Sequence, residues 1–191
     1  MRHHRIPALI TGLWLLAAQP SAPRFDPCSA TGQAPGPALG QDAGAAAEGE
    51  TTSIRGWTVH LGSELAQKPK LRQEVTDLLR AKLREVDSRL PSAIVERLRQ
   101  VPFHMHLNRP GCPGGVYHPS AQWLAEHDLD PTWAGGIEFG NARNFLDWVH
   151  TQPSFVLHEL AHAWHHQVLG YDQPELLAAF ERAASGGTYD E

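Results

Sequence analysis

The sequence has little positive charge and, beyond its first residues, no long apolar run. Its 191 residues include 16 Lys and Arg against 21 Asp and Glu, which gives a formal net charge of −5. Because there is no basic excess, we do not expect nucleic acid as a partner. After residue 22, no stretch approaches the roughly 20 consecutive apolar residues with which a helix spans a bilayer. The chain is 41% hydrophobic and 19% charged, which is typical of a globular protein with one domain.

Cysteine is also scarce, with only Cys28 and Cys112. Cys28 lies within residues 23–52, which are rich in Pro, Gly, Ala, Ser and Gln and have no periodic apolar pattern. Such a segment cannot bury enough surface to offset its chain entropy, so we expect a disordered linker. In an oxidising compartment the two cysteines could form a disulfide, but the sequence leaves free thiols equally open.

The first 22 residues have the organisation of a secretory signal peptide. Residues 1–5 are basic, residues 6–18 are apolar, and small residues follow up to Ala22. The apolar run is too short to cross a bilayer comfortably, although an uncleaved membrane anchor is the alternative. We therefore expect a secreted or periplasmic protein that has no membrane association after cleavage.

Residues 53–191 have the patterns of a folded domain. Apolar residues recur at helical spacing over residues 70–90, and helices are also expected over 92–100, 120–127, 141–151 and 174–184. Strands are expected over 54–61, 103–107, 116–120 and 136–140. Pro119 cannot donate to a neighbouring strand, so its strand is expected at a sheet edge. This order predicts an α+β domain with helices packed on one face of a sheet.

Two histidines of the expected strand 103–107 share one face. His104 and His106 alternate with apolar residues, and alternate residues of a strand point the same way. Side chains that face solvent are the simplest interpretation, and a metal-binding pair is the alternative.

The candidate catalytic and metal-binding residues lie within residues 155–168, which read F-V-L-H-E-L-A-H-A-W-H-H-Q-V. His158, Glu159 and His162 form an H-E-x-x-H motif, a zinc-site signature of metallopeptidases. Residues four apart lie on the same face of a helix, so both imidazoles can point at one ion. Glu159 is expected to act as general base on a zinc-bound water. Apolar neighbours predict a buried helix, with Pro153 at its start and Gly170 at its end. An exposed helix that carries these residues by chance is the alternative.

The run H-E-L-A-H-A-W-H-H, with G-G-V-Y-H-P-S-A-Q-W-L and I-E-F-G-N-A-R-N-F-L before it, resembles a family of secreted bacterial metallopeptidases. These are zincin-type, gluzincin-like enzymes, distantly similar to the catalytic domain of anthrax lethal factor. The resemblance spans about residues 54–191. It implies a zincin-like fold in which an edge strand of a mixed sheet binds an extended peptide by strand addition. It also implies Zn²⁺ as the cofactor.

A zinc peptidase site normally has three protein ligands and a water, and the third ligand is not evident here. Metzincins continue H-x-x-G-x-x-H, but His165 and Val168 stand at the glycine and histidine positions, which excludes that branch. His166 lies about 12 Å along the helix from His158, too far to share its ion. Glu181 is the best candidate within the chain, ahead of Glu175. The families that the chain resembles take a Glu from a helix further on, so the C-terminal part of the domain is expected to be missing.

The sequence thus predicts zinc-dependent hydrolysis of peptide bonds in a peptide or protein substrate. His158 and His162 hold the metal, and Glu159 is the catalytic base. Tyr117 or His118, on the expected edge strand, could donate a hydrogen bond to the oxyanion. Two alternatives come from other classes of protein: a zincin-like binding module that is catalytically incomplete, and a His-rich extracytoplasmic metal-binding protein.

Overall fold

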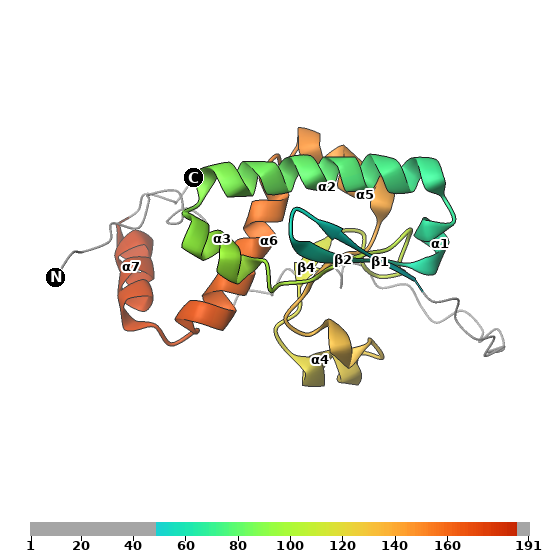
Figure 1. Ribbon diagram of the computed structural model, residues 1–191. Helices are drawn as coiled ribbons and strands as arrows, with labels where there is room; N and C mark the ends of the chain where they lie inside the picture. The colour runs from blue at the N-terminus through green and yellow to red at the C-terminus, as the bar shows by residue number, and fades with distance from the viewer. Residues whose placement is uncertain (1–48, 187–191) are drawn as a thin grey trace.

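A mixed sheet of five strands organises the fold in the computed structural model, which describes residues 49–186 (Figure 1). The strands are β1 (Glu50–Ile54), β2 (Trp57–Leu61), β3 (Phe103–Met105), β4 (Gly115–Tyr117) and β5 (Ile137–Phe139). Seven α-helices accompany them within these residues. The predicted signal peptide, Cys28 and most of the predicted linker lie outside the described residues.

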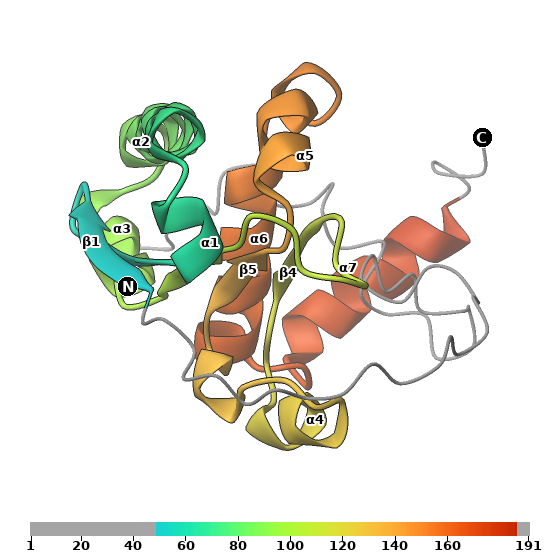
Figure 2. The ribbon, with the colours of Figure 1, turned by 90° about the vertical axis from the view of Figure 1, so that its right-hand side faces the viewer.

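The strand order is β1-β2-β3-β5-β4. β2, β3 and β5 run parallel to one another, whereas β1 is antiparallel to β2 and β4 is antiparallel to β5. Figure 2 shows β4 beside β5 at one side of the sheet. The strand before Pro119 is therefore an edge strand, as predicted, and an α+β architecture with a mixed sheet is confirmed.

The single strand predicted over residues 54–61 is wrong, because the structure has a hairpin there. Arg55 and Gly56 both have positive φ, 53° and 89°, as the two residues of a tight hairpin turn require. β1 begins at Glu50, within the segment 23–52 that was predicted as a linker. β1 was missed because its only buried residue is Ile54 and the other four are polar.

Most of the helices cover one face of the sheet. Figure 1 shows α2 (Pro69–Arg89) above the sheet. The other helices of this part are α1 (Ser63–Ala66), α3 (Ser92–Leu98), α5 (Ala142–Asp147) and α6 (Phe155–Trp164), with a short 3₁₀ turn at Trp148–His150. The predicted apolar stripe of α2 is buried at Leu71, Val75, Leu79, Leu83 and Val86. It meets the apolar face of the strands in one continuous core.

The opposite face of the sheet is covered too, which the sequence did not predict. α4 (Ala121–Glu126) and the 3₁₀ turn Pro131–Trp133 lie below the sheet in Figure 1. The ring centroid of Trp133 lies 5.5 Å from that of His104 and 5.0 Å from that of His106. These two histidines therefore share a face, as expected, but they lie under an indole ring instead of facing solvent.

We call the charged and imidazole side chains on this face the polar layer: His60, His104, His106, Arg109, His118 and Glu138. Its centre is Glu138 on β5, whose side chain is fully buried. Arg109 donates two hydrogen bonds to this carboxylate, one of them from Nη2 to Oε2 at 2.8 Å, and His118 Nε2 lies 2.9 Å from Oε2. Burial raises the pKa of Glu138, but the hydrogen bonds from His118 and Arg109 outweigh it and hold the pKa below its usual value. The Glu138 carboxylate is therefore charged, and the guanidinium of Arg109 balances its charge.

Stability should fall in mild acid because of His104. Burial, together with the nearby charges of His60 and His106, lowers the pKa of this imidazole to about 4. An unfolded histidine titrates near ~6.5, so between pH 6.5 and 4 the unfolded chain binds more protons and stability decreases as pH falls. From pH 7 to pH 5 the loss from this one group is about 2 kcal/mol.

Urea unfolding of the wild type and of His104→Phe at both pH values measures this effect. The phenylalanine keeps a ring beneath Trp133 but cannot titrate, so its pH dependence should be weaker by that amount. His150→Asn, at an exposed histidine, should follow the wild type. Equal pH dependence in wild type and His104→Phe would show that the folded state accepts a charged His104.

Cys112 lies in the loop that leads to β4, and it is disulfide-bonded. The chain has only one other cysteine, Cys28, which lies outside the described residues. The loop is docked closely: a Cβ on Gly140 would lie 2.1 Å from the carbonyl oxygen of Cys112. Cys112 therefore has the bonded state and not that of a free thiol.

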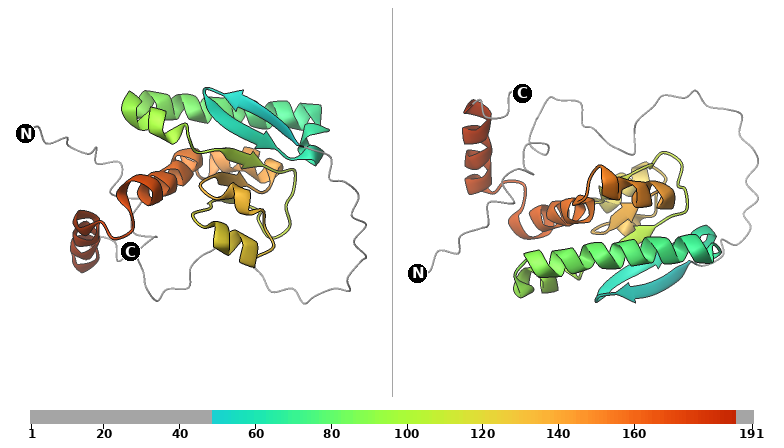
Figure 3. Two further views of the ribbon diagram at one scale, coloured as in Figure 1. Left: turned by 60° about the horizontal axis from the view of Figure 1, so that its bottom comes forward. Right: turned by 90° about the horizontal axis from the view of Figure 1, so that it is seen from above.

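No helix within residues 49–186 combines the length and the apolar character needed to cross a membrane. The last helix described, α7 (Pro174–Ser185), has no buried residue. It lies beyond the end of α6 and away from the sheet (Figure 3).

Candidate metal centre on helix α6

α6 is the helix predicted from the H-E-x-x-H motif. Its apolar residues Phe155, Val156, Leu160 and Ala163 are buried in the core, which leaves the polar motif residues on another face. The α-helix runs from Phe155 to Trp164, so Pro153 lies in the turn before it and not inside it. It continues as a π turn, η4 (His165–Leu169), and ends at Gly170, whose φ is 75°. The predicted glycine stop is confirmed.

The two histidines of the motif point at a common place. Their Nε2 atoms are 3.0 Å apart, and their rings are nearly perpendicular, with an interplanar angle of 80°. Two nitrogens bound to one zinc at ~2.1 Å in tetrahedral geometry are about 3.4 Å apart. The same 3.0 Å also suits a hydrogen bond between two neutral imidazoles. His158 and His162 are thus poised as a pair of ligands, with only a small adjustment needed to accept an ion.

Both imidazoles of this pair are held in the neutral form. Burial lowers the pKa of His162 to about 4, with the charges of His158 and His165 adding to the effect. Burial also lowers the pKa of His158. Metal ions bind neutral imidazole, so the site needs no proton loss at neutral pH.

Glu159 lies next to the pair but faces the edge strand. Its carboxylate accepts a hydrogen bond from the backbone N–H of Tyr117 on β4. Burial raises the pKa of Glu159 to about 7, against the opposite effect of that hydrogen bond. A carboxyl group whose pKa lies near the working pH can both take up and return a proton, which is what a general base of hydrolysis must do.

A third ligand does not join the pair within residues 49–186. No group of three or more His, Cys, Asp or Glu there could hold a metal ion. Glu181 and Glu175, the two internal candidates, are exposed on α7 and do not complete the site. His166 instead forms a hydrogen bond with Tyr117, which agrees with its predicted exclusion. The chemistry of the donors present, two convergent neutral imidazoles, fits two of the ligands of a zinc ion.

The two predicted oxyanion donors are engaged elsewhere. The hydroxyl of Tyr117 lies 2.8 Å from Nδ1 of His166 and accepts a hydrogen bond from Gln167 Nε2 at 3.1 Å. His118 points to the other face of the sheet, where its Nε2 meets Glu138. The structure gives neither side chain the predicted role. In the structure Gln167 also lies close to the site. No spacing pattern in the sequence indicated this residue.

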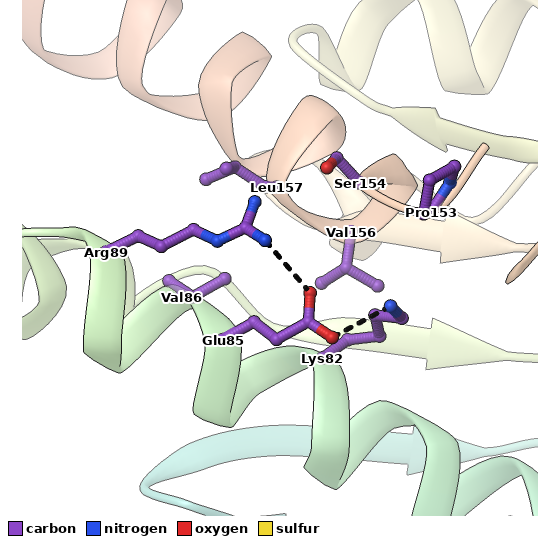
Figure 4. Close-up of a pocket in the computed structure, with 8 residues that line it drawn as sticks. All are labelled: Lys82, Glu85, Val86, Arg89, Pro153, Ser154, Val156 and Leu157. Carbon is purple, nitrogen blue, oxygen red and sulfur yellow. Dashed lines mark hydrogen bonds and ion pairs between the residues drawn. The ribbon is translucent and has the colours of Figure 1, made fainter. Parts of the chain in front are cut away.

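A small cavity lies on another side of α6, against α2 (Figure 4). Its lining consists of Lys82, Glu85, Val86, Arg89, Pro153, Ser154, Val156 and Leu157. Glu85 forms ion pairs there with Lys82 at 3.0 Å and Arg89 at 3.9 Å. The space suits about one water molecule. No residue of the H-E-x-x-H triplet lines it, so it is not a substrate site.

No protein-family model matches the chain, and no curated protein or solved structure matches it either. The resemblance to zincin-type metallopeptidases therefore stays a prediction.

Proposed function

We propose that the chain is a zincin-type, zinc-dependent metallopeptidase. The observation that carries the proposal is the convergence of His158 and His162, with Nε2 atoms 3.0 Å apart, beside the carboxyl group of Glu159. A structural histidine pair on a helix does not by itself call for a half-buried glutamate next to the first histidine. A hydrolytic metal site does, because its base must lie next to the metal without binding it.

The surroundings of the pair support a peptide as substrate. α6 packs against β4, the antiparallel edge strand. In such a strand the backbone groups alternate between the neighbouring strand and the open edge. Gly114 and His118 bond to the β5 side, so Gly115 and Tyr117 turn their backbone groups to the open edge, next to Glu159. An extended peptide would pair with the backbone groups of Gly115 and the carbonyl of Tyr117, because the N–H of Tyr117 already donates to Glu159, and it would lie beside the catalytic base.

Each residue of the motif has a separate task in this proposal. His158 and His162 hold the zinc ion. When bound, zinc polarises the scissile carbonyl and makes its water more acidic. Glu159 takes the proton from the attacking water and returns it to the leaving amine. The third protein ligand lies outside residues 49–186.

The location of the protein belongs to the same proposal. A secreted or periplasmic chain folds where disulfides persist, and the disulfide at Cys112 is consistent with such a compartment. The substrate would then be an extracytoplasmic peptide or protein.

Zinc content of the purified full chain tests the metal site. The wild type should hold one zinc per chain, and His162→Gln should lose it on dialysis, because a single imidazole remains. His150→Gln changes an exposed histidine away from the motif and should keep the metal.

Two results would contradict the proposal. If the chain binds no zinc, it is better described as a zincin-like binding module. Several ions that remain bound in His162→Gln would favour a His-rich metal-binding protein.

A further inference from the structure

The turn that follows α6 is wider than an α-helical turn. The N–H of Gly170 donates to the carbonyl of His165 at 2.8 Å, five residues back instead of four. One extra residue within the turn changes the direction of the side chains after Trp164. His166 and Gln167 lie within this turn and contact β4, a strand about fifty residues earlier in the chain.

Both side chains meet at the hydroxyl of Tyr117. Gln167 Nε2 donates to this oxygen at 3.1 Å and to the carbonyl of Gly135 at 3.2 Å. The same hydroxyl forms a hydrogen bond with Nδ1 of His166, 2.8 Å away, in which the tautomer of the imidazole decides which group donates. Tyr117 is only 6% exposed, so water cannot easily replace these partners. The contact therefore fastens the π turn to the edge strand.

The other end of Tyr117 holds Glu159. Its backbone N–H turns to the open edge and donates to the Glu159 carboxylate. Glu159 and His166 are seven residues apart, about two helical turns, so both lie on the side of α6 that faces β4. One residue of the edge strand is therefore bonded at two points along the same helical segment, before and after His162.

We propose that Tyr117, anchored through its hydroxyl by His166 and Gln167, is a positioning residue that aligns Glu159 with the His158–His162 pair. This inference rests on the proposed function, because alignment matters for a base that must reach a water at the metal. Without the anchor, β4 and the π turn can separate, and the N–H that fixes the carboxylate moves with the strand.

Tyr117→Phe tests the anchor, since it removes only the hydroxyl and keeps the ring and the backbone N–H. Peptide hydrolysis should show kcat lowered about tenfold with KM within about twofold, and zinc content unchanged. Amide hydrogen exchange at position 117, measured on the metal-free chain, should be about tenfold faster. Ser88→Ala removes the hydroxyl of an exposed residue of α2, away from β4, and should leave both readouts unchanged.

Two further pairs of measurements separate an anchor from general loss of stability. His166→Asn keeps an acceptor near the position of Nδ1 and should retain most of kcat, whereas His166→Ala should behave like Tyr117→Phe. Gln167 is exposed, so Gln167→Ala should fold normally and still speed exchange at Tyr117.

The inference is overturned if Tyr117→Phe leaves amide exchange unchanged, or if exchange rises while kcat does not fall. Equal kcat in His166→Asn and His166→Ala would also overturn it. A wild type without peptidase activity would instead refute the proposed function, and the exchange measurement would still decide whether the anchor exists.

Discussion

Glu159→Gln is expected to lower kcat for peptide hydrolysis by about 10²–10⁴-fold while the chain keeps its zinc. Glutamine has nearly the shape of glutamate, and its carbonyl oxygen can still accept the hydrogen bond from Tyr117. It cannot take up a proton, however, so the water attacks without a base. His158 and His162 are untouched, so the metal should remain bound.

The measurement combines kcat on a mixed peptide library with zinc content of the same samples. Glu96→Gln replaces an exposed glutamate of α3 and serves as the matched control. If Glu159→Gln kept more than about a tenth of the wild-type kcat, the general-base role would be wrong. If instead it lost its zinc, the residue would contribute to metal binding rather than to proton transfer.

Glu138→Gln should cost about 3–5 kcal/mol of unfolding free energy, the largest stability change that we expect for a single substitution. The substitution leaves the guanidinium of Arg109, whose side chain is 17% exposed, beside a neutral amide. His118 also loses the charged partner that its Nε2 contacts at 2.9 Å. A buried charge without its partner costs more than the pair itself contributes.

Urea denaturation at pH 7 measures this loss. Glu74→Gln is the matched control, because Glu74 pairs with Lys70 at 4.0 Å on the exposed side of α2 and should change stability by less than about 0.5 kcal/mol. The double variant Glu138→Leu with Arg109→Leu should recover much of the loss, since neither charge is then left alone. A loss below about 1 kcal/mol in Glu138→Gln would show that Arg109 finds water when its partner is neutral.

The features that the sequence predicted correctly are those that depend on residues close together in the chain. The stripe of α2 repeats over 21 residues. Asn141 caps α5 by accepting hydrogen bonds from the backbone of Arg143 and Asn144, a role typical of asparagine. The motif spacing likewise predicted that His158 and His162 share one face. Such features depend on residues a few positions apart, which periodicity and capping preferences describe directly.

The parts that the sequence missed depend on contacts between distant segments. Alternation along β3 shows that His104 and His106 share a face, but only the placement of Trp133, about thirty residues later, decides that this face is covered. Arg109 and Glu138 are 29 residues apart, so no local sequence pattern indicates that they form an ion pair. The wide turn after α6 has no composition signature, because helix periodicity continues smoothly through Trp164.

The wide turn at His165–Leu169 also affects how this chain should be aligned with others. A turn closed by a bond across five residues contains one residue more than an α-helical turn, so a homologue with a regular helix would have one residue fewer between its second motif histidine and its terminal glycine. An alignment without a gap there would pair Gly170 with the residue after the terminal glycine of that homologue. Comparisons of this segment should therefore allow a single-residue gap after Trp164.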